Sequence, residues 1–125
     1  MTREEITERK IDAMIEAYME EVDGRENAAA FHSIEHISES FRFFGGYREF
    51  ILSLEEEGKS HLLLDRMNGY MEQYIARPES DFAKRICLYI YAGALFNIFM
   101  QWLHCSKMEE TLAETVGSVR RLAIA

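Results

Sequence analysis

Two histidines and a glutamate form the group of residues in this sequence that is most typical of metal chemistry. His32 and His36 lie four residues apart in the segment HSIEH, and Glu35 comes directly before the second histidine. The pattern H-x-x-E-H is the signature of one class of zinc hydrolases. Two histidines at this spacing on a helix can share one metal ion. A catalytic zinc needs a third protein ligand, for which His61 and His104 are candidates, although no motif marks either of them.

A position on the protein surface explains the same three residues without a metal. Successive side chains on a helix turn by about 100°, and the side chains that then share one apolar face are Ala30, Ile34, Ile37, Phe41 and Phe44. His32 and His36 fall on the opposite face, beside Glu35. We therefore expect a solvated polar face here, with no metal, no cofactor and no catalytic residue. A zinc-dependent hydrolase that uses the motif remains the alternative function.

Other catalytic patterns are absent from the sequence. Di-iron carboxylate bundles use Glu-x-x-His pairs, but the residues three positions before the four histidines are Ala29, Ser33, Gly58 and Gln101. The sequence also lacks a G-x-S-x-G nucleophile motif, a Walker phosphate-binding loop and a C-x-x-C pair. We therefore predict a protein that is not an enzyme.

Composition and charge narrow the class of protein further. The chain has 125 residues, 48% of them hydrophobic, and a formal net charge of −8. That length suits one domain with its own core, and the acidic balance argues against nucleic-acid binding by this chain alone. Cys87 and Cys105 lie eighteen residues apart in one predicted helix, about 27 Å, which is too far for a disulfide. Two unpaired thiols and a polar start, MTREEITERK, favour a cytoplasmic protein.

The apolar periodicity predicts an all-α fold in a single domain, residues 1–125. Thr2 and Glu5 form a capping box at the start of the first helix. Gly45 and Gly58 stand where the second and third helices should stop, and Pro78 suits the first turn of the fifth. The six predicted helices cover residues 3–22, 26–44, 47–57, 60–76, 79–105 and 107–122.

The fifth predicted helix contains a long uncharged stretch, ICLYIYAGALFNIFMQWL, at residues 86–103. Its eighteen residues meet the lower length for a membrane span, whereas a helix that is apolar all round is otherwise buried on every side. Asn97 and Gln101 share one face, which is costly in lipid, and the neighbouring helices are amphipathic and need a partner. We therefore expect burial and no membrane contact, with a membrane-anchored helical protein as an alternative.

The last two helices predict an interface between two copies of the chain. A helix over residues 79–105 is about 40 Å long, which exceeds what a domain of this size usually covers. The final helix has its own apolar stripe at Met108, Leu112, Val116, Val119 and Ala123. The chain's other helices would cover one side of this pair, and a second copy would cover the other. This favours a four-helix interface with two-fold symmetry.

The same region resembles the end of the ligand-binding domain of TetR-like transcriptional regulators. The resemblance rests on the long apolar helix YIYAGALFNIFMQWL, the turn HCSKM and the helix EETLAETVGSVRRL, and it covers about residues 25–122. It implies that the last two helices dimerise as a four-helix bundle. Family members begin with a basic helix-turn-helix domain, and residues 1–22 resemble the helix that follows it. The resemblance therefore implies the regulatory half of such a protein, without its DNA-binding head.

The resemblance also implies a small effector bound between the middle helices and the long helix. Aromatic and methionine side chains suit an adaptable apolar pocket, and the predicted ligand contacts are Phe41, Phe44, Phe50, Met67, Tyr70, Met71, Tyr89, Phe96 and Asn97. The predicted contacts between two copies are Gly93, Gln101, Leu112, Val116 and Val119. We therefore expect a homodimer that binds a small, apolar effector. A helical protein-interaction bundle without a cavity is a further alternative.

Overall fold

The computed structural model describes residues 1–21, 34–72 and 81–124. Over these residues it contains six helices and no strand, which confirms the predicted all-α helical bundle. The helices are α1 (Arg3–Glu21), α2 (Ile34–Gly45), α3 (Arg48–Glu56), α4 (Ser60–Tyr70), α5 (Phe82–Leu103) and α6 (Met108–Ile124).

Several helix ends lie where their residue types predict them. The Thr2 hydroxyl oxygen accepts a hydrogen bond of 3.1 Å from the backbone N–H of Glu5 at the start of α1, as an N-terminal cap requires. Helix α2 ends at Gly45. Gly58 follows α3 with a φ of 71°, a left-handed conformation that favours glycine. Local chemistry therefore sets these boundaries.

The start of α5 differs from its prediction. The helix begins at Phe82, three residues later than predicted, because the Asp81 carboxylate accepts a 2.8 Å hydrogen bond from the backbone N–H of Lys84. Asp81 is thus the N-terminal cap. The proposed role of Pro78 falls outside the described residues.

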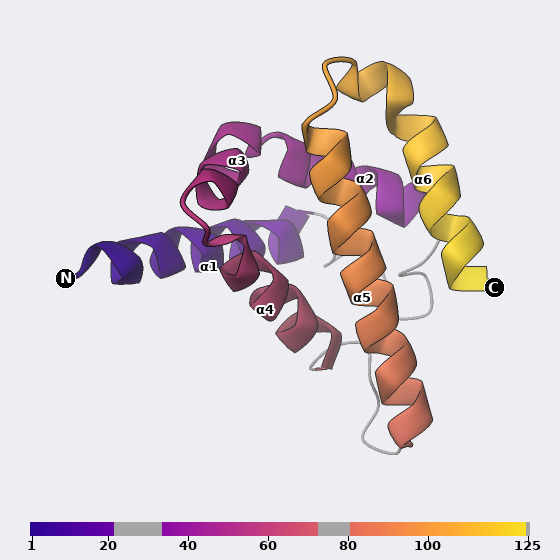
Figure 1. The fold of residues 1–125 in the computed structure, drawn as a ribbon, viewed down its shortest axis with the longest axis horizontal. Helices are drawn as coiled ribbons and strands as arrows, with labels where there is room; N and C mark the ends of the chain where they lie inside the picture. The colour runs from indigo at the N-terminus through magenta and orange to yellow at the C-terminus, as the bar shows by residue number, and fades with distance from the viewer. Residues whose placement is uncertain (22–33, 73–80, 125) are drawn as a thin grey trace.

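Figure 1 shows the arrangement of the six helices. Helices α5 and α6 run antiparallel and pack against each other, and α2 lies against α6. Helix α1 packs against α2, and α4 packs against α5 and α3. One core joins all six helices. Its largest fully buried side chains are Ile11, Met14, Ile37, Ile51, Leu54, Leu103, Val116 and Val119.

Trp102 holds the turn between α5 and α6 against the end of α2. Its indole N–H donates a 2.8 Å hydrogen bond to the backbone carbonyl of Met108. A Cβ atom on Gly45 would lie 3.2 Å from two ring carbons of Trp102. The glycine that ends α2 therefore also allows this close packing.

The apolar stripe of α6 faces the chain's own core, and three of the side chains predicted to contact a second copy lie there. Leu112, Val116 and Val119 are 2%, 1% and 1% exposed within the single chain. They pack into the core that α2 and α5 share with α6. In the single chain these three side chains are therefore already covered by the core around them.

Helix α5 is covered unevenly along its length. Its buried residues all lie between Ala92 and Leu103. The first half exposes large apolar side chains instead: Phe82 is 78% exposed, Ile86 41% and Ile90 66%. By length and composition α5 could cross a membrane, and 33% of its apolar window is buried inside the chain. Within a single chain, the expected burial of the uncharged stretch therefore extends over the second half of the helix and not over the first.

Candidate functional site

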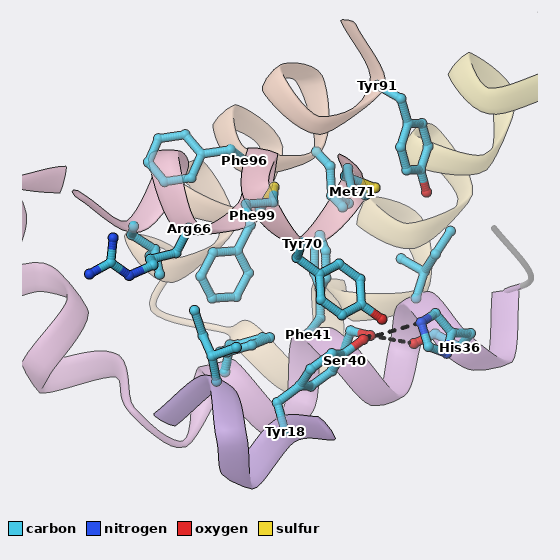
Figure 2. Close-up of a pocket in the computed structure, with 16 residues that line it drawn as sticks. Tyr18, His36, Ser40, Phe41, Arg66, Tyr70, Met71, Tyr91, Phe96 and Phe99 are labelled. Carbon is cyan, nitrogen blue, oxygen red and sulfur yellow. Dashed lines mark hydrogen bonds between the residues drawn. The ribbon is translucent and has the colours of Figure 1, made fainter. Parts of the chain in front are cut away.

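An apolar pocket lies between α1, α2, α4 and α5. Its volume is about 110 Å³, and almost all of the surface that faces it is apolar. Figure 2 shows side chains from these four helices converging on it. The lining residues are Ile15, Tyr18, His36, Ile37, Ser40, Phe41, Phe44, Leu63, Arg66, Met67, Tyr70, Met71, Tyr91, Leu95, Phe96 and Phe99.

Helical spacing brings these side chains to one place. On α2, Ile37, Phe41 and Phe44 follow each other at intervals of four and three residues, which puts them on one face. On α5, Phe96 and Phe99 are three residues apart and point the same way. The ring centroids of Phe41 and Phe99 lie 5.2 Å apart at 78°, an edge-to-face contact. Aromatic packing between α2 and α5 thus forms one wall of the pocket.

Six of the nine predicted ligand contacts line this pocket: Phe41, Phe44, Met67, Tyr70, Met71 and Phe96. The other three do not. Phe50 is half-buried and packs against the core from α3. Tyr89 is 39% exposed, and its hydroxyl bonds to the Glu72 carboxylate. Asn97 is exposed, because the residue after Phe96 turns about 100° away from the pocket.

The structure corrects the interpretation of His36. The imidazole is only 5% exposed, whereas the sequence predicted a solvated face. Its Nε2 atom lies 3.1 Å from the hydroxyl of Tyr18, which is itself buried. Helix α1 covers the face of α2 that carries His36. More of the circumference of α2 is therefore buried than its own apolar stripe indicates. Tyr18, Ser40 and Tyr91 are lining residues that the sequence reasoning missed.

A small hydrogen-bonded group forms the polar corner of the pocket. The Ser40 hydroxyl donates to the backbone carbonyl of His36 at 2.8 Å, four residues earlier on α2. The Tyr18 hydroxyl lies 2.8 Å from the Ser40 oxygen. Because Ser40 has one hydrogen and donates it to the carbonyl, Tyr18 supplies the hydrogen in this second bond. Figure 2 shows these bonds at the edge of the pocket.

Two ionisable side chains at the pocket have shifted pKa values. Burial raises the pKa of the Tyr91 hydroxyl to about 12, so this group stays protonated at neutral pH. The Arg66 guanidinium donates from Nε to the Asp12 carboxylate at 2.7 Å. That hydrogen bond raises the pKa of Arg66 above its ordinary value. Arg66 lines the pocket with its hydrocarbon part and directs its charged end toward α1.

The motif residues do not assemble a zinc site within the described part of the chain. His36 is buried, while Glu35 one residue earlier is exposed, so the two side chains point in different directions. His61 is exposed, and the His104 imidazole bonds to the Glu55 carboxylate at 2.6 Å. His32 lies outside the described residues. Over the residues that are described, no group of three or more His, Cys, Asp or Glu side chains has an arrangement that could hold a metal.

No family model matches the chain, and neither a curated protein nor a solved structure matches it at a significant level.

Proposed function

We propose that this chain is a non-catalytic regulatory domain that binds one small apolar molecule and self-associates through the outer face of α5. The pocket between α1, α2, α4 and α5 carries the proposal. Ligand sites are typically concave and mostly apolar, with a few polar groups at fixed positions. This pocket fits that description, because Tyr18 and Ser40 place two bonded hydroxyls beside a wall of carbon and sulfur.

The resemblance to TetR-like regulators supports the same function, and it stays a prediction because no family model matches the chain. In such a regulator, an effector that binds one of two dimer shapes more tightly shifts the equilibrium between them. Here Tyr91, Leu95, Phe96 and Phe99 line the pocket from α5. A ligand in the pocket would therefore contact the helix that we propose at the interface between copies.

The outer face of α5 supports self-association. Phe82, Ile86, Ile90, Gly93, Asn97 and Gln101 follow each other at intervals of four or three residues, so they form one face of the helix. A Cβ atom on Gly93 would meet nothing within 4 Å, so a second helix can approach closely there. We therefore keep Gly93 and Gln101 in the proposed interface and replace Leu112, Val116 and Val119 with Ile86 and Ile90.

Ligand binding is tested by thermal unfolding of the full chain with a panel of small apolar molecules. A ligand present at a hundred times its dissociation constant stabilises the folded state by about 2.7 kcal/mol. For a domain of this size, that corresponds to a rise of roughly 5–15 °C in Tm. The proposal fails if no molecule in the panel raises the Tm.

Self-association is tested by light scattering in detergent-free buffer across a concentration series. We expect a molar mass of twice the chain's 14.6 kDa. A monomer at every concentration would remove self-association from the proposal.

A protein-interaction module is the second candidate function. The exposed side chains of Phe82, Ile86 and Ile90 favour it, because a large apolar patch marks a contact surface. The same two experiments separate the candidates. An interaction module without effector binding would show no ligand-induced rise in Tm.

A further inference from the structure

Resting on the proposed function, we propose that the pocket takes an uncharged aromatic molecule of about one ring and rejects anions. Four properties of the pocket define this ligand class: its size, its aromatic wall, the position of its charged side chain and the use of its hydrogen-bond donors.

The size of the pocket limits the ligand to about one ring. Its volume is about 110 Å³. An apolar cavity of about 150 Å³ holds a single benzene molecule. The volume of the pocket is therefore comparable to that of a site for one ring.

Aromatic side chains from four helices line the pocket and favour a flat aromatic ligand. The rings come from α1, α2, α4 and α5: Tyr18, Phe41, Phe44, Tyr70, Phe96 and Phe99. Tyr18 and Tyr70 already meet edge to face, with centroids 6.3 Å apart at 70°. Such aromatic pairs stabilise a contact by more free energy than the buried area alone predicts. Met67 and Met71 also line the pocket, and a thioether makes favourable contacts with an aromatic ring.

The charged side chain at the pocket directs its charge elsewhere. Arg66 is the only Lys, Arg, Asp or Glu among the described residues that line the pocket. Its Nε donates to Asp12 at 2.7 Å, so its charge is already paired with a carboxylate. Figure 2 shows its guanidinium turned away from Phe99. An anion in the pocket would lose its hydration without meeting a cation, which is costly.

The hydrogen-bond donors of the polar corner are already committed. Ser40 donates to the carbonyl of His36, and Tyr18 donates to Ser40. A carboxylate or ketone on a ligand that accepts a hydrogen bond from Ser40 or Tyr18 would break an existing bond. The polar corner therefore disfavours ligands whose polar group can only accept hydrogen bonds.

Three matched probes test this ligand class: toluene, methylcyclohexane and benzoate. They share a six-membered ring, and they differ in aromaticity or in charge. The full chain carries ¹³C-labelled methionine methyl groups and is titrated with each probe by NMR. We expect toluene to shift the methyl signals of Met67 and Met71. We expect it to bind about tenfold tighter than methylcyclohexane and about a hundredfold tighter than benzoate.

Two variants test the location of binding. Leu95→Phe adds bulk to a half-buried residue that lines the pocket, and we expect it to abolish the toluene shifts. Leu62→Phe is the matched control on α4, because Leu62 is half-buried against the core without lining the pocket. It should bind toluene as the unmodified chain does. Toluene shifts that persist in Leu95→Phe would overturn the assignment to this pocket.

The ranking of the three probes on the unmodified chain decides the ligand class, whether or not Leu95→Phe folds. Equal affinity for toluene and methylcyclohexane, or tightest binding of benzoate, would overturn the aromatic, uncharged class while leaving the proposed function standing. Binding of none of the three, together with no Tm rise from the wider panel, would overturn both.

Discussion

The hydroxyl of Tyr18 on α1 lies 3.1 Å from Nε2 of His36 on α2 and 2.8 Å from the hydroxyl oxygen of Ser40. These hydrogen bonds connect the two helices at a buried position. A hydrogen bond there contributes more to stability than one at the surface. The Tyr18 ring also packs against Phe44, with centroids 4.8 Å apart. The Tyr18 side chain thus joins α1 to the face of α2 that carries His36, and it also forms part of the pocket wall.

The substitution Tyr18→Phe should lower the free energy of unfolding by about 1–2 kcal/mol, because it removes hydrogen bonds at a buried site and leaves their partners less satisfied. Urea unfolding measures the change. Tyr47→Phe is the matched control, since Tyr47 is half-buried against the core and its ring contacts Phe43. We expect a change within about 0.5 kcal/mol there. Equal effects of the two substitutions would contradict a special role for Tyr18.

Local signals predicted much of the fold. Thr2 and Glu5 marked the start of α1, and Gly45 and Gly58 marked the ends of α2 and α3. These signals act over one turn of the chain, so a sequence shows them directly. Asp81 carried the same type of signal for the start of α5 and was overlooked in favour of the proline before it.

The sequence could not show which element covers a given helix face. The stripe of Leu112 and Val116 predicted burial correctly, but a stripe does not distinguish a second copy from the chain's own α2 and α5. His36 was misassigned for the same reason, because Tyr18 comes from a helix 18 residues earlier. Periodicity gives the face that is buried, and only tertiary packing gives the partner.

Val116→Glu should unfold the chain rather than merely separate two copies. Val116 is 1% exposed, and a buried carboxylate without a partner is among the most destabilising changes known. We expect the free energy of unfolding to fall by more than about 3 kcal/mol. The control is Ala113→Glu, at an exposed position on the same helix. A folded, stable Val116→Glu monomer would show that this side chain contacts a second copy after all.

Ile90→Glu should remove self-association while leaving the fold intact. Ile90 is 66% exposed on the outer face of α5, so the glutamate stays hydrated in a single chain. In a pair of chains it would be buried against an apolar surface. Light scattering should therefore report a monomer with an unchanged circular dichroism spectrum. Ile6→Glu on α1 is the matched control, because Ile6 is 44% exposed and lies outside the proposed interface. A dimer that survives Ile90→Glu would exclude this face.

Tyr91 should make the stability of the fold depend on pH in alkaline solution. Burial raises its folded-state pKa to about 12, while the unfolded chain ionises at about 10. The contribution of the protonated Tyr91 hydroxyl to the free energy of unfolding is therefore fully present below about pH 10, and it is lost as the pH rises toward 12. A pKa shift of that size corresponds to a change of about 2–3 kcal/mol in the free energy of unfolding.

Comparison with Tyr91→Phe isolates this contribution, because phenylalanine does not ionise. Urea unfolding of both proteins at about pH 9 and about pH 11.5 measures it. We expect the unmodified chain to lose more stability than the variant between the two pH values. Parallel losses would mean that the Tyr91 hydroxyl is hydrated in the folded protein.

The most direct test of a ligand-binding pocket is a crystal structure of the chain under xenon pressure. Xenon enters apolar cavities and avoids polar, water-filled ones. The account predicts a xenon atom between Phe41, Phe96 and Phe99, in the pocket between α1, α2, α4 and α5. Ordered water in the same space, or side chains that close it completely, would contradict a domain built to hold a small apolar molecule.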